Sequence, residues 1–459
     1  MSAAAAAVRQ SRVSRGAALA RLALRIGGRY AARSPRLLFA SVERRKELRH
    51  DLAYRSADEV AEELGAMKGV LMKLGQMASY IYEDMPATVR AAMSRLQQKA
   101  PPMTPALAAS VVEAELGGSP ADVFAEWDPV PFAAASIGQV HRAITRDGRA
   151  VAVKVQYPGI ARSITSDLRN VGLLRRVVGA AFPGLDTRSF VDEIAERIQE
   201  EVDYVREAES QELFARYYDG HPVIRVPHVI AGLSTARVLT SELDSGVSFD
   251  DLLTWDQHEK DLAAETIHRF VFRSLYRLHA FNGDPHPGNY LFHRGGRVTF
   301  LDFGLTKLFT DRDLAPLIDA VRFLVFEKDY EGFRRALEQA GFLKAGAPVS
   351  TELVVDRFGQ FYGTALQDEA MSITPAYASA IVRRFFDARS PLAPYSNVPR
   401  EYVIMQRINL GLYAVLGSLN ATANWRRIAE EIWPFRNGPP STPIGEAEAT
   451  WEAARRAIA

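Results

Sequence analysis

The spacing of hydrophobic residues predicts a long amphipathic helix ahead of the first strands. Apolar side chains recur every three or four positions along "DEVAEELGAMKGVLMKLGQMASYI", at Val60, Leu64, Met67, Leu71, Leu74 and Ile81. This period matches one face of an α-helix. Lys73 and Gln76 are three residues apart on the same helix, so they project from a common face.

A second helix is predicted after "KAPPM". Thr104 can cap its N-terminus with Pro105 in the first turn, and Gly117 can end it. Ser119 and Pro120 repeat the start pattern. We therefore expect the segment before residue 130 to be helical and to lie outside any sheet.

The pattern then changes to strands. "SIGQVHRAIT" and "RAVAVKVQY" flank Asp147 and Gly148, a strong hairpin pattern. The later segments are predicted as follows: helix at 161–215, strand within 236–246, helices at 247–281, a short strand in "RVTFLDFG", and helices beyond about 310 that end with a proline-rich tether and a last short helix.

Composition points to an ordinary globular protein. The chain is 47% hydrophobic and 24% charged, as is common for such proteins, and its length of 459 residues favours two to four compact units. The chain has no cysteine, so disulfides, thiolate metal sites and a cysteine nucleophile are excluded. The apolar stretch 408–421 is shorter than the ~20 residues that span a bilayer, and we interpret it as a buried core helix.

Charge is concentrated at the N-terminus. The first fifty residues contain twelve Arg or Lys against Glu43 and Glu47, so the rest of the chain is acidic although the net charge is +1. Apolar residues and arginines alternate at helical intervals in this arm, as in helices that lie on membranes. A solvated arm without fixed structure and an Arg-rich organellar transit peptide are the alternatives.

Lys154 is a candidate phosphate ligand. It is the one long cation in the valine-rich stretch "VAVKVQ". Such a lysine often only reaches solvent from its strand. A hairpin whose second strand carries a lysine is, however, the arrangement of the ATP-binding lobe of protein kinases, in which an acid on a following helix orients the lysine.

An acidic helix follows. "EEVDYVREAES" contains several carboxylates, including Glu201, Asp203 and Glu207. Asp203 and Glu207 are four residues apart and are expected to share a face, whereas Glu201 lies about 200° around the helix from Asp203. A solvated acidic helix is the alternative.

The third element is "NGDPHPGNYLF" followed by "VTFLDFG". Phosphoryl transfer needs an aspartate near the acceptor, an amide oxygen on Mg²⁺ and a second carboxylate between metal and phosphates. Asp284, Asn289 and Asp302 supply these groups in this order. A transition-metal site at His279, Asp284 and His286 is the disfavoured alternative, because no second histidine pair at metal-binding spacing is present.

With these motifs the sequence resembles the UbiB-type atypical kinases, also called the AarF-domain family. The resemblance runs from about residue 60 to at least 310 and rests on "KLGQ", "FAAASIGQVHRA", "VAVKVQYPG", "EVDYVREAE", "DPHPGN" and "LDFG". It implies that an alanine-rich loop replaces the glycine-rich loop of kinases and that the "KxGQ" helix lies over the active site. Each alanine Cβ restricts φ, so this loop is stiffer than one made of glycine.

The resemblance also implies residue roles. Ala133, Ala134, Ala135 and Ser136 would cover the nucleotide, Glu242 and Leu243 would form the hinge at adenine, and Lys154 would pair with Glu207. Asp284 would be the catalytic aspartate, and Asn289 and Asp302 the Mg²⁺ ligands. Glu201 and Asp203 would face Lys73 and Gln76 as a regulatory contact. Asn282, where many relatives have histidine, and Gln98, where an acid is common, depart from the family pattern.

The expected fold is α+β: a bilobal protein-kinase-like fold with a small, mostly β N-lobe and a mostly α C-lobe, preceded by a helical extension that contains the KxGQ motif. The expected boundaries are a basic arm at 1–55, the extension at 56–128, the N-lobe at 129–243, the C-lobe with its helical continuation at 244–435, and a tether with a short helix at 436–459.

The expected function is that of an ATP- and Mg²⁺-dependent atypical kinase or ATPase that supports isoprenoid quinone or other lipid metabolism. A nucleotide-gated scaffold without phosphoryl transfer is the alternative. The expected partners are ATP, a membrane surface, isoprenoid or lipid precursors and quinone-biosynthesis proteins, without nucleic acid; the oligomeric state stays open. We expect a cytoplasmic protein peripheral to the membrane, or a mitochondrial one if the arm is a transit peptide.

Overall fold

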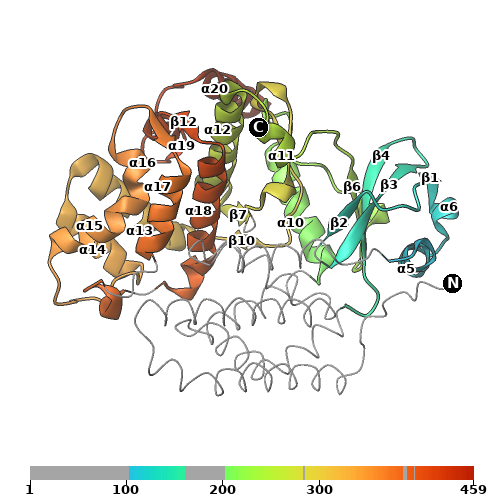
Figure 1. The fold of residues 1–459 in the computed structure, drawn as a ribbon, viewed down its shortest axis with the longest axis horizontal. Coiled ribbons are helices and arrows are strands. Elements are labelled where there is room, and N and C mark those ends of the chain that lie inside the picture. The colour runs from blue at the N-terminus through green and yellow to red at the C-terminus, as the bar shows by residue number, and fades with distance from the viewer. Residues whose placement is uncertain are drawn as a thin grey trace, which may run out of the picture. The chain divides into compact units, whose positions relative to one another are not determined.

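The computed structural model describes residues 103–135, 137–160, 202–282, 285–385, 390–396 and 398–458 (Figure 1). Contacts divide them into two compact units. The first comprises the described residues up to Arg206 together with Val229–Leu243, and the second comprises Glu207–His228 together with the described residues from Asp244 onward. The helix α10, Tyr204–Tyr217, therefore begins in the first unit and continues in the second.

The first unit is built on an antiparallel five-stranded sheet in the order β1-β3-β4-β6, with β2 also paired to β3. Its strands are β1 (Phe124–Trp127), β2 (Ala133–Ala135), β3 (Gly138–Thr145), β4 (Ala150–Gln156) and β6 (Val238–Glu242). The hairpin predicted at Asp147 and Gly148 is confirmed, and Gly148 adopts the positive φ of 85° that such a turn requires.

Among the described residues, two helices precede this sheet. In α5, Pro105–Leu116, the Thr104 side chain accepts from the Leu107 amide and Gly117 ends the helix at φ 78°, as predicted. The helix α6, Pro120–Val123, is a single turn. The expectation that everything before residue 130 lies outside the sheet is wrong, because β1 follows α6 directly and pairs with β3.

The second unit is mostly helical (Figure 1). Its buried apolar side chains form one large core. Aromatic rings from three elements meet in it: Phe214 of α10 lies 4.9 Å from Phe303, and Phe270 stacks on Phe300 at 3.6 Å. Its helices are α11 (Phe249–Leu253), α12 (Gln257–Arg273), α13 (Asp311–Val321), α14 (Tyr330–Gln339), α15 (Thr351–Gly359), α16 (Gly363–Leu366), α17 (Pro375–Phe385), α18 (Arg400–Ser418), α19 (Trp425–Ile432) and α20 (Pro443–Ile458).

Short helical turns connect these elements. They are the π-helices η2 (Ser274–Leu278) and η5 (Arg322–Glu327), and the 3₁₀ turns η3 (Pro287–Asn289), η4 (Arg294–Gly296), η6 (Gln360–Tyr362) and η7 (Ala393–Tyr395), with η1 (Ala231–Leu233) in the first unit. The core helix expected at 408–421 is confirmed as the C-terminal part of α18, where Leu412, Val415 and Leu416 are buried.

In the described part of the second unit, three small sheets accompany the helices. The strands β5 (Ile224–Arg225), β9 (Val298–Phe300) and β8 (Tyr290–Phe292) form one, and β7 (Ala280–Asn282) pairs with β10 (Thr306–Leu308) in another. The third joins β11 (Met371–Ile373) to β12 (Ala421–Ala423). The expectation that only helices follow residue 310 is therefore wrong for β11 and β12. These two strands form by long-range pairing with each other, which the local periodicity of the sequence does not reveal.

The last helix is tied to α12 by a buried charge cluster. Arg269 is fully buried, and its guanidinium contacts Glu265 at 2.8 Å, Glu431 at 2.8 Å and Glu448 of α20 at 2.7 Å. Burial alone would raise the pKa of Glu448, but the His221 hydrogen bond and the charges of Arg273 and Arg269 hold it at about 2. This C-terminal helix is thus an integral part of the second unit.

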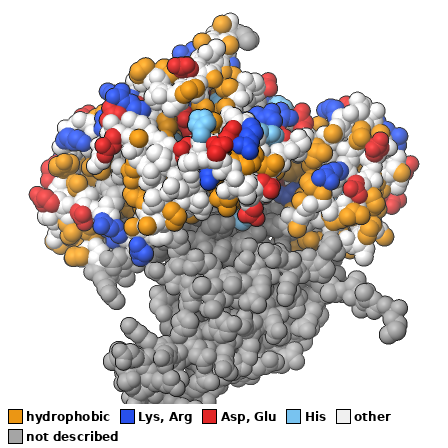
Figure 2. All heavy atoms as spheres, turned by 45° about the horizontal axis from the view of Figure 1, so that its top comes forward, with side chains coloured by type: hydrophobic (Ala, Val, Ile, Leu, Met, Phe, Trp, Pro, Cys, Tyr) orange, Lys and Arg blue, Asp and Glu red, His pale blue; other side chains and the backbone are white. Residues whose placement is uncertain are grey.

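The described surface is chemically mixed. On the face shown in Figure 2, acidic and basic side chains are interspersed with hydrophobic ones. Among the described residues, no helix combines the length and the apolar character that crossing a membrane requires.

Candidate functional site

Lys154 occupies the middle of the central strand of the first unit. In β4 its Cα lies opposite Val140 of β3 on one side and Leu239 of β6 on the other. Its Nζ lies 5.0 Å from the centre of the Tyr204 ring, a cation–π contact with the first residue of α10. The lysine is therefore held between two strands and directed to the start of the acidic helix.

The alanine-rich segment is a strand and not an open loop. Ala133, Ala134 and Ala135 pair with Val140, Gln139 and Gly138 of β3. Ala133 and Ala134 are exposed, and Ala135 is half-buried. The next residue, Ser136, lies outside the described residues. Regular pairing with β3 fixes the backbone that the sequence predicts to cover a nucleotide.

Gly138 is a site residue that the sequence analysis did not single out. A Cβ at this position would collide with the Val155 carbonyl oxygen and would lie 2.9 Å from the Tyr204 hydroxyl. Glycine thus permits the close approach of β3, β4 and the start of α10 beside Lys154. The sequence indication that Gly138 belongs to the site was its position in "SIGQ", directly after the alanine segment.

A buried hydrogen-bond relay follows Gly138 on β3. The Gln139 side-chain oxygen accepts from the Met103 amide at 2.8 Å, and its amide donates to His141 Nε2 at 2.8 Å. His141 Nδ1 in turn donates to the Asp128 carbonyl at 2.8 Å. One neutral tautomer of His141 allows all three hydrogen bonds to form at once. Burial lowers the pKa of His141, which favours the neutral imidazole.

The expected hinge residues end the sheet of the first unit. Glu242 is the last residue of β6 and lies opposite Val151, and the Leu243 amide donates to the Ala150 carbonyl at 3.1 Å. The Leu243 N–H is therefore used within the sheet, and the hinge role of Glu242 and Leu243 stays a prediction.

In the second unit, two predicted metal ligands lie at the same end of a strand pair. Asn289 immediately precedes β8, and Asp302 follows β9 by two residues. These strands are antiparallel with Tyr290 opposite Phe300, and the Leu301 amide donates to the Asn289 carbonyl at 3.0 Å. The pairing thus brings an asparagine and an aspartate to one end of the strand pair, and both residue types carry the oxygen donors that Mg²⁺ prefers.

The turn around Asp302 is fixed at several points. The Gly304 amide donates to Asp302 Oδ1 at 3.0 Å, and the Asn282 side-chain amide donates to the Asp302 carbonyl at 2.7 Å. Phe303 is completely buried in the core. Asn282, which the sequence analysis treated only as a departure from the family pattern, is thus a positioning residue for this aspartate.

Glu207 is buried next to this turn. It lies in the first turn of α10 with 3% of its surface exposed. A Cβ added at Gly304 would lie 3.4 Å from Asp302 Oδ1 and 3.7 Å from Glu207 Oε2, so both carboxylates flank this glycine. Asp203 precedes the helix and accepts hydrogen bonds from the Val205 and Arg206 amides, so it caps α10 and is not on a shared helix face with Glu207.

Several predicted residues lie outside the described residues. They are Lys73, Gln76, Ser136, Glu201 and Asp284. The loop after Asp284 is nevertheless supported by α18, because a side chain at Gly411 would collide with the Pro285 ring. The tight contact fixes Pro285 against a core helix.

The histidines of the rival metal site have separate partners. His279 Nδ1 lies 3.3 Å from Asp311 Oδ1, and His286 Nδ1 accepts from the Gly288 amide at 2.9 Å. Within the described ranges, no three His, Cys, Asp or Glu side chains form a group that could hold a metal ion.

Comparison with solved structures identifies the class of fold. A structure from Mycobacterium tuberculosis, described as the complex of Rv3197 with erythromycin, matches with a TM-score of 0.61 and 30% identity, covering 86% of this chain and 100% of that one. The expected protein-kinase-like fold, with a sheet-rich N-terminal part and a helical C-terminal part, is confirmed.

The sequence comparisons then identify the family. The model of the ABC1 atypical kinase-like domain matches residues 95–337, more than half of the chain. The chain belongs to this family, which confirms the UbiB-type resemblance.

Two curated relatives show the extent of the similarity. "Protein ACTIVITY OF BC1 COMPLEX KINASE 8, chloroplastic" of Arabidopsis thaliana is 32% identical over 71% of this chain and 43% of its own length. "Atypical kinase COQ8B, mitochondrial" of Rattus norvegicus is 34% identical over 59% of this chain and 52% of its own. The chain thus spans about half the length of the curated relatives it matches.

Proposed function

We propose that this chain is an atypical kinase or ATPase that binds Mg-ATP. The observation that carries the proposal is the pairing of β8 with β9, which brings Asn289 and Asp302 to one strand end while Asn282 and Gly304 hold the aspartate from both sides. One hydrogen bond holds the Asp302 carboxylate and the other holds its backbone carbonyl, so both the side chain and the peptide of this residue are fixed, as a preorganised binding site requires.

The first unit supports the same proposal. Lys154 sits on a central strand, surrounded by regular pairing and held over the Tyr204 ring. Tyr204 and Glu207 are three residues apart on α10 and share a helix face. We propose that Lys154 holds the α and β phosphates and that Glu207 orients it, with Ala133, Ala134, Ala135 and Ser136 above the nucleotide and Glu242 and Leu243 at adenine.

The remaining roles follow the chemistry of each side chain. Asn289 and Asp302 would hold Mg²⁺, which neutralises phosphate charge when bound. Asp284 would orient the acceptor and accept its proton. Lys73 and Gln76 would meet Glu201 and Asp203, a contact that would restrict bulky protein acceptors and favour a small lipid-like one. We extend the proposal to isoprenoid quinone or lipid metabolism, the role expected of the family.

Turnover by the pure protein tests this function. Phosphate release from ATP and phosphoryl transfer are measured with Mg²⁺, with and without anionic vesicles and prenylated phenolic precursors. We expect activity that Lys154→Ala abolishes and that Lys344→Ala, a change at an exposed lysine, leaves intact. Nucleotide binding without turnover in every condition would instead support the nucleotide-gated scaffold, and the absence of both would overturn the proposal.

A further inference from the structure

The C-terminal helix α20 donates hydrogen bonds to the backbone at the end of α10. The Trp451 indole nitrogen donates to the Asp219 carbonyl at 2.9 Å, and the Arg455 guanidinium donates to the carbonyl of Tyr217, the last residue of α10. The final carbonyls of a helix have no partner within it and carry partial negative charge. The helix α20 therefore supplies donors, one of them cationic, where α10 needs them.

Aromatic contacts reinforce this end of α10. The Trp451 ring lies 4.6 Å from that of His221, and it is nearly parallel to the Tyr218 ring at 6.5 Å. The Arg455 guanidinium lies over the Trp451 ring, 4.9 Å from its centre. Aromatic pairs and cation–π contacts stabilise beyond the burial of their area. Trp451 thus packs directly against the segment in which α10 ends.

A buried carboxylate anchors α20 beside this contact. Burial lowers the pKa of His221, which keeps its imidazole neutral. Its Nδ1 accepts from the Ile224 amide at 3.0 Å, so the ring proton is on Nε2, which donates to Glu448 of α20 at 3.0 Å. Glu448 also pairs with Arg269 of α12 at 2.7 Å. One carboxylate of α20 therefore links the core helix α12 to the segment that follows α10.

Core side chains hold α10 along one face. Phe214 lies 4.9 Å from Phe303, and the Tyr218 hydroxyl, one turn further on, lies 2.8 Å from Ser274 Oγ. Packed helices can still slide past one another by about 1–2 Å. Hydrogen bonds from α20 to the terminal carbonyls oppose such a movement along the axis of α10, because they are directional.

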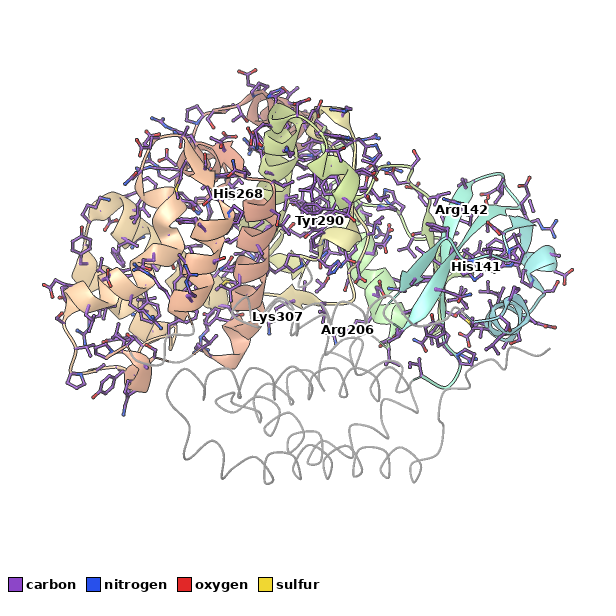
Figure 3. All side chains as sticks on the ribbon, in the orientation of Figure 1. His141, Arg142, Arg206, His268, Tyr290 and Lys307 are labelled. Atoms are coloured by element: carbon purple, nitrogen blue, oxygen red, sulfur yellow. The ribbon has the colours of Figure 1, made fainter. Side chains whose placement is uncertain are left out.

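The opposite end of α10 carries Glu207. It lies ten residues before Tyr217, which is about 15 Å along the helix axis. Arg206, the residue before Glu207, is labelled at this end of α10 in Figure 3. A helix moves as a stiff rod, so a shift at one end displaces the other by a similar distance. A misplacement of about 1 Å can lower a reaction rate about 100-fold.

We propose that α20 positions Glu207 for the reaction, with Trp451 as the main positioning residue and Arg455 as the second. The inference rests on the proposed function, in which Glu207 orients Lys154. Trp451 and Arg455 act through the backbone at the end of α10 and are not themselves catalytic residues. The C-terminal helix is then part of the machinery that sets the rate of turnover.

A double-mutant cycle on turnover tests the proposal. Trp451→Leu should lower kcat for phosphate release from Mg-ATP about tenfold and change the Kd of Mg-ATP less than about twofold, because the nucleotide contacts remain. In a Glu207→Gln background, Trp451→Leu should lower kcat less than about twofold, since the carboxylate that it positions is already gone. The same loss in both backgrounds would indicate general damage to the fold and overturn the proposal, as would an unchanged kcat in Trp451→Leu.

Two adjacent arginines provide a matched pair of variants. Arg455→Met removes the donor to Tyr217 and should lower kcat about threefold. Arg456→Met should leave kcat unchanged, because this guanidinium pairs with Glu452 within α20. The pair replaces Trp451→Leu if that protein fails to fold, and equal effects of the two arginine variants would refute the assignment.

Hydrogen exchange separates this inference from the proposed function. Trp451→Leu should speed exchange of the amides of α10 from residue 208 onward, while α14 keeps its protection. Absent turnover, or full turnover in Glu207→Gln, would refute the proposed role of Glu207 and this inference with it. Unchanged exchange along α10 in a chain with normal turnover would refute this inference alone.

Discussion

The side-chain amide of Asn282 donates a 2.7 Å hydrogen bond to the backbone carbonyl of Asp302. Asn282 is 8% exposed and lies in β7, which pairs with β10 on the far side of the Asp302 turn. A residue twenty positions earlier in the chain thus fixes the peptide that carries the candidate metal-binding carboxylate.

Asn282→Leu should weaken both stability and nucleotide binding. The change leaves the Asp302 carbonyl without this donor in a mostly buried site, which costs about 1–3 kcal/mol. Denaturant unfolding measures the stability, and a thermal shift with Mg-ATP measures the binding. Asn282→His, which keeps a ring N–H that can donate, should restore more of the nucleotide response than leucine does. Equal responses of the two variants would contradict the positioning role.

Asp302→Asn should remove most of the Mg²⁺-dependent stabilisation by ATP. The amide keeps the shape of the side chain but loses the charge that would attract the metal. The measurement is the melting temperature with ATP, in the presence and absence of Mg²⁺. Asp250→Asn, at an exposed carboxylate of α11, is the matched control and should behave as the unmodified protein does. A full Mg²⁺ response in Asp302→Asn would exclude Asp302 as a ligand.

Arg269→Met should strongly destabilise the second unit. Without its guanidinium, the buried carboxylates of Glu265, Glu431 and Glu448 lose their shared cation. Removing one partner of a buried ion pair typically costs about 3–5 kcal/mol. Arg456→Met, at a side chain that is 78% exposed, should change stability by less than about 0.5 kcal/mol. Urea unfolding of both variants makes the comparison.

Stability should fall as the pH drops below about 6.5, in part because of His268. Burial and the nearby Arg269 lower the pKa of His268 to about 3 in the folded chain, from 6.5 in the unfolded one. Its stabilising contribution is therefore complete above pH 6.5 and is lost toward pH 3, at up to about 1.4 kcal/mol per pH unit. His268→Leu should flatten the pH dependence of unfolding, whereas His258→Leu, at an exposed histidine of the same helix, should not.

Gln139→Leu should loosen the segment that enters α5. The substitution leaves the Met103 amide and His141 Nε2 unpaired in a buried site, at about 1–3 kcal/mol for each orphaned group. Hydrogen exchange should become faster at Met103, and the unfolding midpoint should fall. Gln367→Leu, at an exposed glutamine, is the control. Unchanged protection of Met103 would show that the relay does not hold this segment.

Local sequence patterns predicted the elements whose formation depends on neighbouring residues. The Thr104 cap, the Gly117 stop and the Gly148 turn are all confirmed, because each follows from backbone conformation or a hydrogen bond within a few residues. The strand β1 and the β11–β12 pair were missed, because such short strands are defined by their pairing partners and not by their own periodicity.

The candidate site also contains residues that local motifs predict and residues that they do not. The motifs grouped Asn289 with Asp302 and predicted the strand before Asp302, but they did not predict β8, which pairs with that strand. The roles of both residues stay predictions. The support from Asn282, Gly138 and Gly411 could not be inferred from the motifs, since each depends on a close contact with a residue distant in the chain. Sequence motifs indicate the groups that perform chemistry more readily than those that hold them in place.

The order of the strands in the first unit also constrains how the chain folds during synthesis. The strand β4 pairs with β3 as soon as both have been made, but its other edge is covered by β6, which begins only at Val238. Until then a growing chain on the ribosome exposes an apolar strand edge of the kind that promotes aggregation. Residues 207–228, which belong to the second unit, are translated within this interval. The first unit therefore cannot complete its sheet before part of the second unit has emerged, and neither unit corresponds to one continuous stretch of chain that could be expressed alone.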